Sequence, residues 1–238
     1  TNFAHSYPSF AVSVAVLRRA VPVAGVVIEF VGGPGAWATK TYAAARNGGA
    51  TLNGAPIAVS RVSRVDRALL VTGFGYEHDD AWAANLELFR HFTDVSQGVR
   101  RLGAASVDLC HVALGVVEAY WEYRLKVREM RGGGERESEG ATATAPTQPH
   151  PSPPPSFLQP WDVAAGVLIV EEAGGRVSTM DGLPYSVFQR SLLASNDSIH
   201  EAVQEKTEAA TATLRDAGVD MSPWFIPKGF RVHTGAQL

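Results

Sequence analysis

One segment of the chain, Val127–Gln159, sets the limit on what can fold here. Its 33 residues include six prolines, four glycines and seven charged side chains, but only four large apolar ones. Burial of so little apolar surface does not offset the entropy lost when such a segment becomes ordered. We therefore expect this segment to be disordered and the ordered structure to come from the chain on either side of it.

Composition excludes several classes of protein. With 238 residues and 45% hydrophobic side chains, the chain can bury a sizeable core, as one large or two small domains. A net charge of −3 gives no basic field, so we expect no nucleic-acid partner and no anionic membrane partner. The single cysteine, Cys110, excludes an internal disulfide and favours a reducing compartment. The longest apolar runs, such as Val163–Val170, are far shorter than the roughly 20 residues of a membrane span, so we expect a soluble protein.

The pattern of apolar residues predicts a mixture of strands and helices. Alternating and β-branched runs predict strands over 10–17, 24–30, 37–44, 57–60, 68–72, 176–180 and 191–194, the first of them as an antiparallel meander. Apolar residues three or four apart predict helices over 79–95, 104–117 and 199–217. Asp162 near its start and Gly174-Gly175 as its stop predict another helix over 162–173. This mixture favours an α/β fold of layered sheets and helices.

The sharpest motif is the run WDVAAGVLIVEEAGG at residues 161–175. Asp162 stands at a predicted helix start, where a carboxylate beside free backbone N–H groups suits a divalent cation together with an anionic oxygen. An ordinary N-cap would explain the same aspartate, and close helix packing would explain the small residues 164–166. The residues alone leave both interpretations open.

Several separated motifs resemble one family. The run at 161–175 is similar to the C-terminal signature of the inositol monophosphatase family, and TNFAHSYPSFAVSVAVL at the start is similar to the stretch after that family's first metal motif. GGATLNGAPIAVS and RRLGAASVDLCHVALGVVEAYWEY resemble its hairpin and its substrate-binding helix. The resemblance covers 1–126 and about 160–205. It implies the alternating α-β-α-β-α sandwich of the sugar-phosphatase superfamily, incomplete at the N-terminus, with 1–126 and 160–238 as one domain. GFGYEHDDAW and the tail with Trp224 and Phe225 resemble the plant and algal plastid branch, which implies a chloroplast location.

The resemblance also implies a site and a reaction. Asp162 would ligate the second Mg²⁺, Glu122 would accept a hydrogen bond from a substrate hydroxyl, and Gly103 with Ala104 would line the substrate ring through backbone groups. The reaction would be hydrolysis of a phosphate monoester, myo-inositol monophosphate, with two or more Mg²⁺ ions, and relatives are commonly homodimers. Histidinol phosphate or another sugar phosphate is an alternative substrate. Without the resemblance, Glu122 reads as a solvated charge and Gly103 as a glycine that starts a helix.

The metal set is incomplete in these residues. Thr1 matches the residue after the family's Asp-Pro-hydrophobic-Asp-Gly-Thr motif, so Asp162 is the one carboxylate of the implied set that the 238 residues contain. We expect a polypeptide of these residues alone neither to bind Mg²⁺ productively nor to hydrolyse phosphate esters. A non-catalytic scaffold that has lost the metal ligands is the alternative to an enzyme. A different metal site made by His5, His78, His91 and His111 matches no ligand spacing, and His111 on an apolar helical face reads as a core histidine.

The disordered segment interrupts the family pattern at one point. Glu122 and Asp162 are forty positions apart, and removal of Val127–Gln159 leaves seven, the spacing found in the family. Every valine codon begins GT and one glutamine codon ends AG, so the segment has the ends of an unspliced intron. We interpret it as a translated retained intron, and a genuine disordered surface loop is the competing interpretation.

Overall fold

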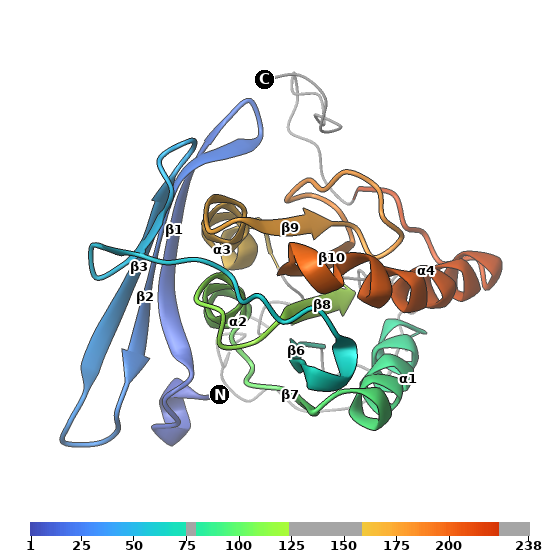
Figure 1. Ribbon diagram of the computed structural model, residues 1–238, viewed down its shortest axis with the longest axis horizontal. Helices are drawn as coiled ribbons and strands as arrows, with labels where there is room; N and C mark the ends of the chain where they lie inside the picture. The colour runs from blue at the N-terminus through green and yellow to red at the C-terminus, as the bar shows by residue number, and fades with distance from the viewer. Residues whose placement is uncertain (75–79, 124–158, 224–238) are drawn as a thin grey trace, which may run out of the picture.

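Residues 1–74, 80–123 and 159–223 are described by the computed structural model. They form layers (Figure 1): a first β-sheet, the helices α2 and α3, a second β-sheet, and the helices α1 and α4 on its far side. The layered fold with mixed helices and sheets is thus confirmed. Within the described residues the order of layers is β-α-β-α.

The first sheet is an antiparallel meander, and the alternating runs predict its first three strands but not the last two. Its strands, in spatial order, are β1 (Phe10–Arg18), β2 (Val21–Val31), β3 (Ala38–Ala45), β4 (Ala50–Leu52) and β5 (Ala55–Pro56). Asn53 and Gly54 both have positive φ, as the two-residue turn between β4 and β5 requires. The strand expected over 57–60 is wrong. Past Ile57 the chain leaves the sheet, and the Val59 N–H donates instead to the carbonyl of Ala173 at 3.1 Å.

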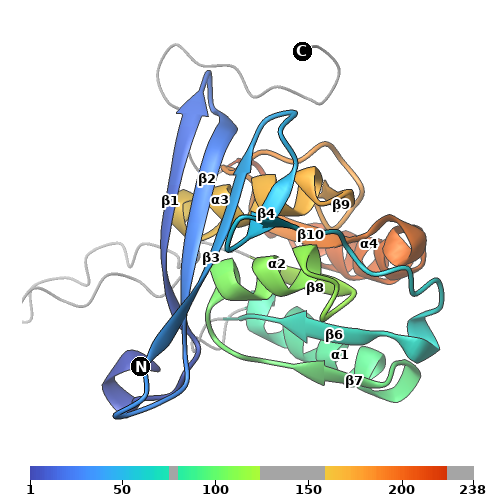
Figure 2. The same ribbon diagram turned by 60° about the vertical axis from the view of Figure 1, so that its left-hand side comes forward.

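The second sheet is mixed and has the order β7-β6-β8-β10-β9. Its strands are β6 (Leu69–Thr72), β7 (Gly98–Arg100), β8 (Ala119–Tyr123), β9 (Gly175–Ser178) and β10 (Ser191–Asn196). β6 is parallel to β7 and β8, whereas β10 is antiparallel to β8 and β9. Helices cover both faces of this sheet (Figure 2), so all five residues of β8 are buried.

The helices follow the apolar spacing. They are α1 (Asp80–Val95), α2 (Ala105–Ala113), α3 (Pro160–Glu172) and α4 (His200–Asp216), with short 3-10 turns η1 (Phe3–His5), η2 (Val65–Arg67) and η3 (Asp197–Ile199). The helix expected over 104–117 ends four residues early. Gly115 has a φ of 74°, a conformation that leaves the helix. No helix among the described residues is long and apolar enough to cross a membrane.

Small residues let α3 pack tightly between the first sheet and α2. A Cβ on Gly25 of β2 would lie 2.8 Å from the Cα of Ala165, and a Cβ on Gly166 would lie 2.7 Å from the Cβ of Leu109 on α2. Real side-chain contacts are not that short, so both positions require glycine. Close packing therefore explains the small residues of the 161–175 motif.

A buried polar group joins the first sheet to α2. Glu29 of β2 accepts a hydrogen bond from the Tyr42 hydroxyl at 3.0 Å and lies 3.1 Å from Nε2 of His111. Burial by itself raises the pKa of Glu29, but His111, Tyr42 and Lys40 together bring it below its usual value. His111 is thus partnered on the inner side of its helix, as expected for a core histidine.

Candidate functional site

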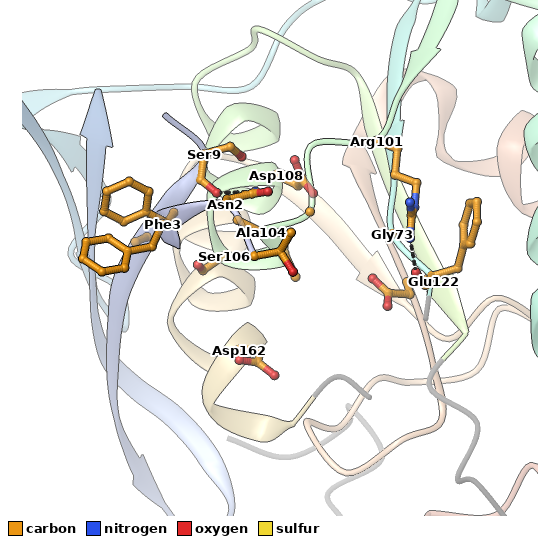
Figure 3. Close-up of a pocket in the computed structure, with 16 residues that line it drawn as sticks. Asn2, Phe3, Ser9, Gly73, Arg101, Ala104, Ser106, Asp108, Glu122 and Asp162 are labelled. Carbon is orange, nitrogen blue, oxygen red and sulfur yellow. Dashed lines mark hydrogen bonds between the residues drawn. The ribbon is translucent and has the colours of Figure 1, made fainter. Parts of the chain in front are cut away.

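A cavity of about 470 Å³ opens where the first turns of α2 and α3 meet the start of the chain and the ends of β6 and β8 (Figure 3). It is lined by Thr1, Asn2, Phe3, Ser9, Phe10, Ala11, Gly73, Phe74, Arg101, Gly103, Ala104, Ala105, Ser106, Asp108, Glu122 and Asp162. The four residues that the sequence singles out, Gly103, Ala104, Glu122 and Asp162, all line this cavity. The structure thus brings them together from three separate parts of the chain.

Asp162 lies in the first turn of α3, on the cavity wall. α3 begins at Pro160, two residues before the expected bound at Asp162, and Gln159 is its N-cap. Asp162 is therefore near the helix start, as expected, but it is not the N-cap. The reason is a capping box: Oδ2 of Asp162 accepts the N–H of Gln159 at 2.6 Å. Asp162 therefore stabilises the start of its own helix and also turns a carboxylate toward the cavity.

Gly103 and Ala104 form the approach to α2. Gly103 has a φ of +81°, and Ala104 is the N-cap of α2, a position where its methyl side chain supplies no cap. The first N–H groups of a helix have no intrahelical acceptor, so they attract an anionic ligand when they face a cavity. Ala105 and Ser106, in the first turn, line the cavity beside them.

Glu122, on β8, forms the cavity wall opposite the start of α2. Its side chain is buried, and Oε2 accepts a hydrogen bond from the hydroxyl of Tyr120 on the same face of the strand. A Cβ on Gly73 would lie 2.1 Å from this oxygen, so the glycine after β6 makes room for the carboxylate. The solvated-charge interpretation of Glu122 is wrong, because β8 is an interior strand.

Asp108 is a cavity residue that the sequence analysis missed. It is 1% exposed, and neither carboxylate oxygen has a hydrogen-bond partner among the described residues. Burial raises its pKa well above the usual value, and the charge of Glu122 raises it further. The available signal was an acidic residue inside an apolar helical stripe, between Val107 and Leu109.

Two further cavity residues hold the walls together. The Asn2 side-chain amide donates to the carbonyls of Ser9 at 2.7 Å and Leu102 at 2.8 Å, which ties the start of the chain to the loop before α2. Arg101 lies over the Phe74 ring at 4.3 Å and donates to the Phe74 carbonyl at 2.7 Å. Figure 3 shows Asn2 and Arg101 on opposite sides of the cavity.

The described residues do not make a magnesium cage by themselves. Mg²⁺ takes six ligands, mainly oxygens, in a strict octahedron. Among residues 1–74, 80–123 and 159–223, no group of three or more His, Cys, Asp or Glu side chains could hold a metal ion. Of the four histidines considered from the sequence, His78 lies outside the described residues.

The cavity can still hold a polar anion. The first turns of two helices offer positive ends to an anionic group, and Glu122 offers an acceptor to a hydroxyl. An anionic head and a hydroxyl-bearing body would thus be bound at different walls.

Comparison with known proteins shows to which family the chain with this cavity belongs. A family model described as "Inositol monophosphatase family" matches residues 1–133 and 152–215, which is most of the chain. The chain belongs to the inositol monophosphatase family. The match confirms the resemblance of its separated motifs.

Relatives in this family are similar over almost the whole chain. "Phosphatase IMPL1, chloroplastic" of Arabidopsis thaliana is 54% identical over 230 residues, covering 97% of this chain and 53% of the relative. "Inositol-1-monophosphatase" of Synechocystis is 38% identical over 213 residues, covering 90% of this chain and 60% of the relative. The solved inositol monophosphatase of Anabaena has a TM-score of 0.66 and 34% identity, with 94% of this chain and 69% of that one covered. The chain thus spans about half to two thirds of the length of these relatives.

Proposed function

We propose that the protein is a hydrolase of phosphate monoesters and that its substrate is myo-inositol monophosphate. The observation that carries the proposal is that Gly103, Ala104, Glu122 and Asp162 line one cavity in a chain of the inositol monophosphatase family. A phosphatase of this family, named for inositol 1-phosphate, is 38% identical to this chain. Hydrolysis of such esters is so slow without a catalyst that a barrier reduction on the order of 20 kcal/mol is required.

The position of each residue in the cavity suggests its role. The N–H groups at the start of α2, beside Gly103 and Ala104, bind an anionic oxygen of the ester. Glu122 accepts a hydrogen bond from a ring hydroxyl, and Tyr120 and Gly73 fix its orientation. Asp162, on a rigid first turn, turns a carboxylate toward the reacting end of the substrate.

Mg²⁺ is part of the proposal through Asp162. When bound, it would supply positive charge at the phosphate and an activated water. The described residues contribute one carboxylate to it, so a polypeptide of these 238 residues alone is expected to have no productive magnesium binding and no turnover. If the protein is instead a non-catalytic scaffold, the protein from the complete reading frame is also expected to show no turnover.

Phosphate release from myo-inositol 1-phosphate in millimolar Mg²⁺ tests the proposal. The protein from the complete reading frame that contains this chain is expected to be active, and Asp162→Asn is expected to lose at least about a hundredfold in kcat/KM. Asp66→Asn is the matched control, because Asp66 is exposed and pairs only locally with Arg64. Equal activity of Asp162→Asn and the unsubstituted protein would contradict the role of Asp162. Release from histidinol phosphate alone would replace the proposed substrate.

The proposal includes a homodimer and a chloroplast location. β1 and β2 leave Val12, Val14, Val16 and Val26 between 37% and 60% exposed on the sheet face opposite α2 and α3. An apolar face of this kind supports burial against a second copy. The chloroplast location is supported by the similarity to "Phosphatase IMPL1, chloroplastic".

We also propose that Val127–Gln159 is a translated retained intron within one domain. All but Gln159 of this segment lies outside the described residues. The family model leaves 134–151 unmatched, which supports an insertion here. Gln159 itself is the N-cap of α3, so its removal would give that position to Lys126 in the spliced chain.

A further inference from the structure

Asp108 is a buried acid that the proposed function does not use. It lies in the first turn of α2, is 1% exposed, and lines the same cavity as Glu122 and Asp162. Neither of its oxygens has a hydrogen-bond donor among the described residues. A core position of this kind normally carries an apolar side chain, so the carboxyl group requires its own explanation.

An ionised carboxylate is costly at this place. Moving an ionised carboxylate out of water is strongly unfavourable unless a cation or several N–H groups compensate it. Glu122 lines the same cavity and raises the pKa of Asp108, so the two carboxyl groups interact. Ionisation of one buried carboxyl group makes ionisation of the other less favourable, because like charges repel. We therefore expect one of the pair to keep its proton.

The surroundings indicate which of the two keeps it. Glu122 receives the Tyr120 hydroxyl, which stabilises its charged form, whereas Asp108 receives no donor among the described residues. The pKa of Asp108 is raised well above its usual value, first by burial and then by Glu122.

Other groups lie around the cavity or pack against α2. Arg101, from the loop before α2, is placed against Phe74 by its ring contact and its hydrogen bond to the Phe74 carbonyl. Asp162, from α3, adds a further acid to the cavity wall. β10, which also packs on α2, carries no ionisable side chain between Ser191 and Asn196.

We propose that Asp108 is a positioning residue for Glu122: as a neutral carboxylic acid it leaves Glu122 the ionised partner, and the cavity accepts an anionic phosphate ester only while Asp108 keeps its proton. Loss of that proton would add a buried negative charge to a cavity whose ligand is itself a dianion. It would also push the Glu122 carboxylate away from the place where a ring hydroxyl donates to it. This inference rests on the proposed function for its ligand, but not for the protonation state of Asp108.

The protonation state is tested directly by carbon NMR. Protein from the complete reading frame, with ¹³C at the aspartate side-chain carboxyls, is titrated without ligand, and Asp108→Asn identifies the signal. We expect this carboxyl to titrate well above the ordinary aspartate range, and its midpoint to move to lower pH in Glu122→Gln. Glu201→Gln, at an 87% exposed side chain that pairs with Arg176, is the control and is expected to leave the midpoint unchanged. A midpoint in the ordinary range, or one that Glu122→Gln does not move, overturns the proposal.

The effect on the ligand is tested by calorimetry with myo-inositol 1-phosphate between pH 7.5 and 9.5, where the phosphate is a dianion throughout. If only the protonated form of Asp108 binds, affinity falls by up to about tenfold for each pH unit above the midpoint. Asp108→Asn, which stays neutral, is expected to lose this dependence while it keeps the neutral-pH affinity. The same slope in both proteins overturns the proposal. If neither protein binds at any pH, the proposed function fails, and the NMR titration then decides the inference about Asp108.

Discussion

Replacement of Gly25 by alanine tests the packing that holds α3, and Asp162 with it, against the first sheet. The new Cβ would lie 2.8 Å from the Cα, 3.1 Å from the Cβ and 3.2 Å from the carbonyl oxygen of Ala165. Carbon atoms in good contact are about 3.5–4.0 Å apart, so the helix must move by roughly 0.7 Å or more. The obstacle is helix backbone, which no rotamer change relieves.

The magnitude follows from that displacement. A gap of about 0.5–1 Å already removes a quarter to a half of the van der Waals attraction along the contact. Overpacking of a core lowers the free energy of unfolding by about 1–3 kcal/mol. For a chain of this size, 1 kcal/mol corresponds to about 2–4 °C, so we expect Tm to fall by about 2–12 °C.

Thermal unfolding followed by circular dichroism measures the change. Gly33→Ala is the matched control, because a Cβ there meets nothing within 4 Å and its φ is not in the positive range. We expect it to change Tm by no more than about 1 °C. A Gly25→Ala protein that melts within about 1 °C of the unsubstituted chain would refute the proposed contact between β2 and α3.

Three more predictions concern His200, the exposed face of β1 and the segment 127–159. His200 is buried between the hydroxyls of Ser178 and Ser195, and burial lowers its pKa to about 4. Between pH 6.5 and 4 the unfolded chain therefore binds a proton that the native state excludes, so the free energy of unfolding in urea should fall by about 3 kcal/mol over this range. His200→Gln should lack this pH dependence. Val14→Glu, on the exposed face of β1, should convert a dimer to a monomer in light scattering, whereas Glu87→Gln on α1 should leave the mass unchanged. Sequencing of the transcript should find a major form without the codons for 127–159; a major form that retains them would favour the disordered loop.

The sequence predicts the elements whose apolar pattern is regular. The first three strands of the meander and all four helices were predicted. The short strands β4 and β5 were not predicted, and a strand was wrongly expected over 57–60. β7 and β8 were missed for opposite reasons. β7 has only three residues, and β8 is covered on both faces, so neither has the alternation that identifies a strand.

The candidate site was predicted in part, and resemblance was needed for it. Gly103, Ala104, Glu122 and Asp162 meet at one cavity, but nothing in their spacing shows that β8 and α3 would bring Glu122 and Asp162 to it. Asp108 was missed because the pattern of an amphipathic helix gives no information about a buried acid without a partner. Its environment depends on contacts between α2 and β8, which only the folded chain reveals.

The edges of the sheets have a consequence for how this protein behaves in concentrated solution. β5, β7 and β9 are edge strands of two to four residues, too short to template another strand. β1 is a nine-residue edge strand with a single charge, at Arg18, and with alternate valines that are exposed to solvent. Long, apolar, uncharged edges recruit strands from other molecules. If the edge of β1 stays exposed at high protein concentration, fibril growth is therefore expected to start at β1. Val14→Lys is expected to prevent it.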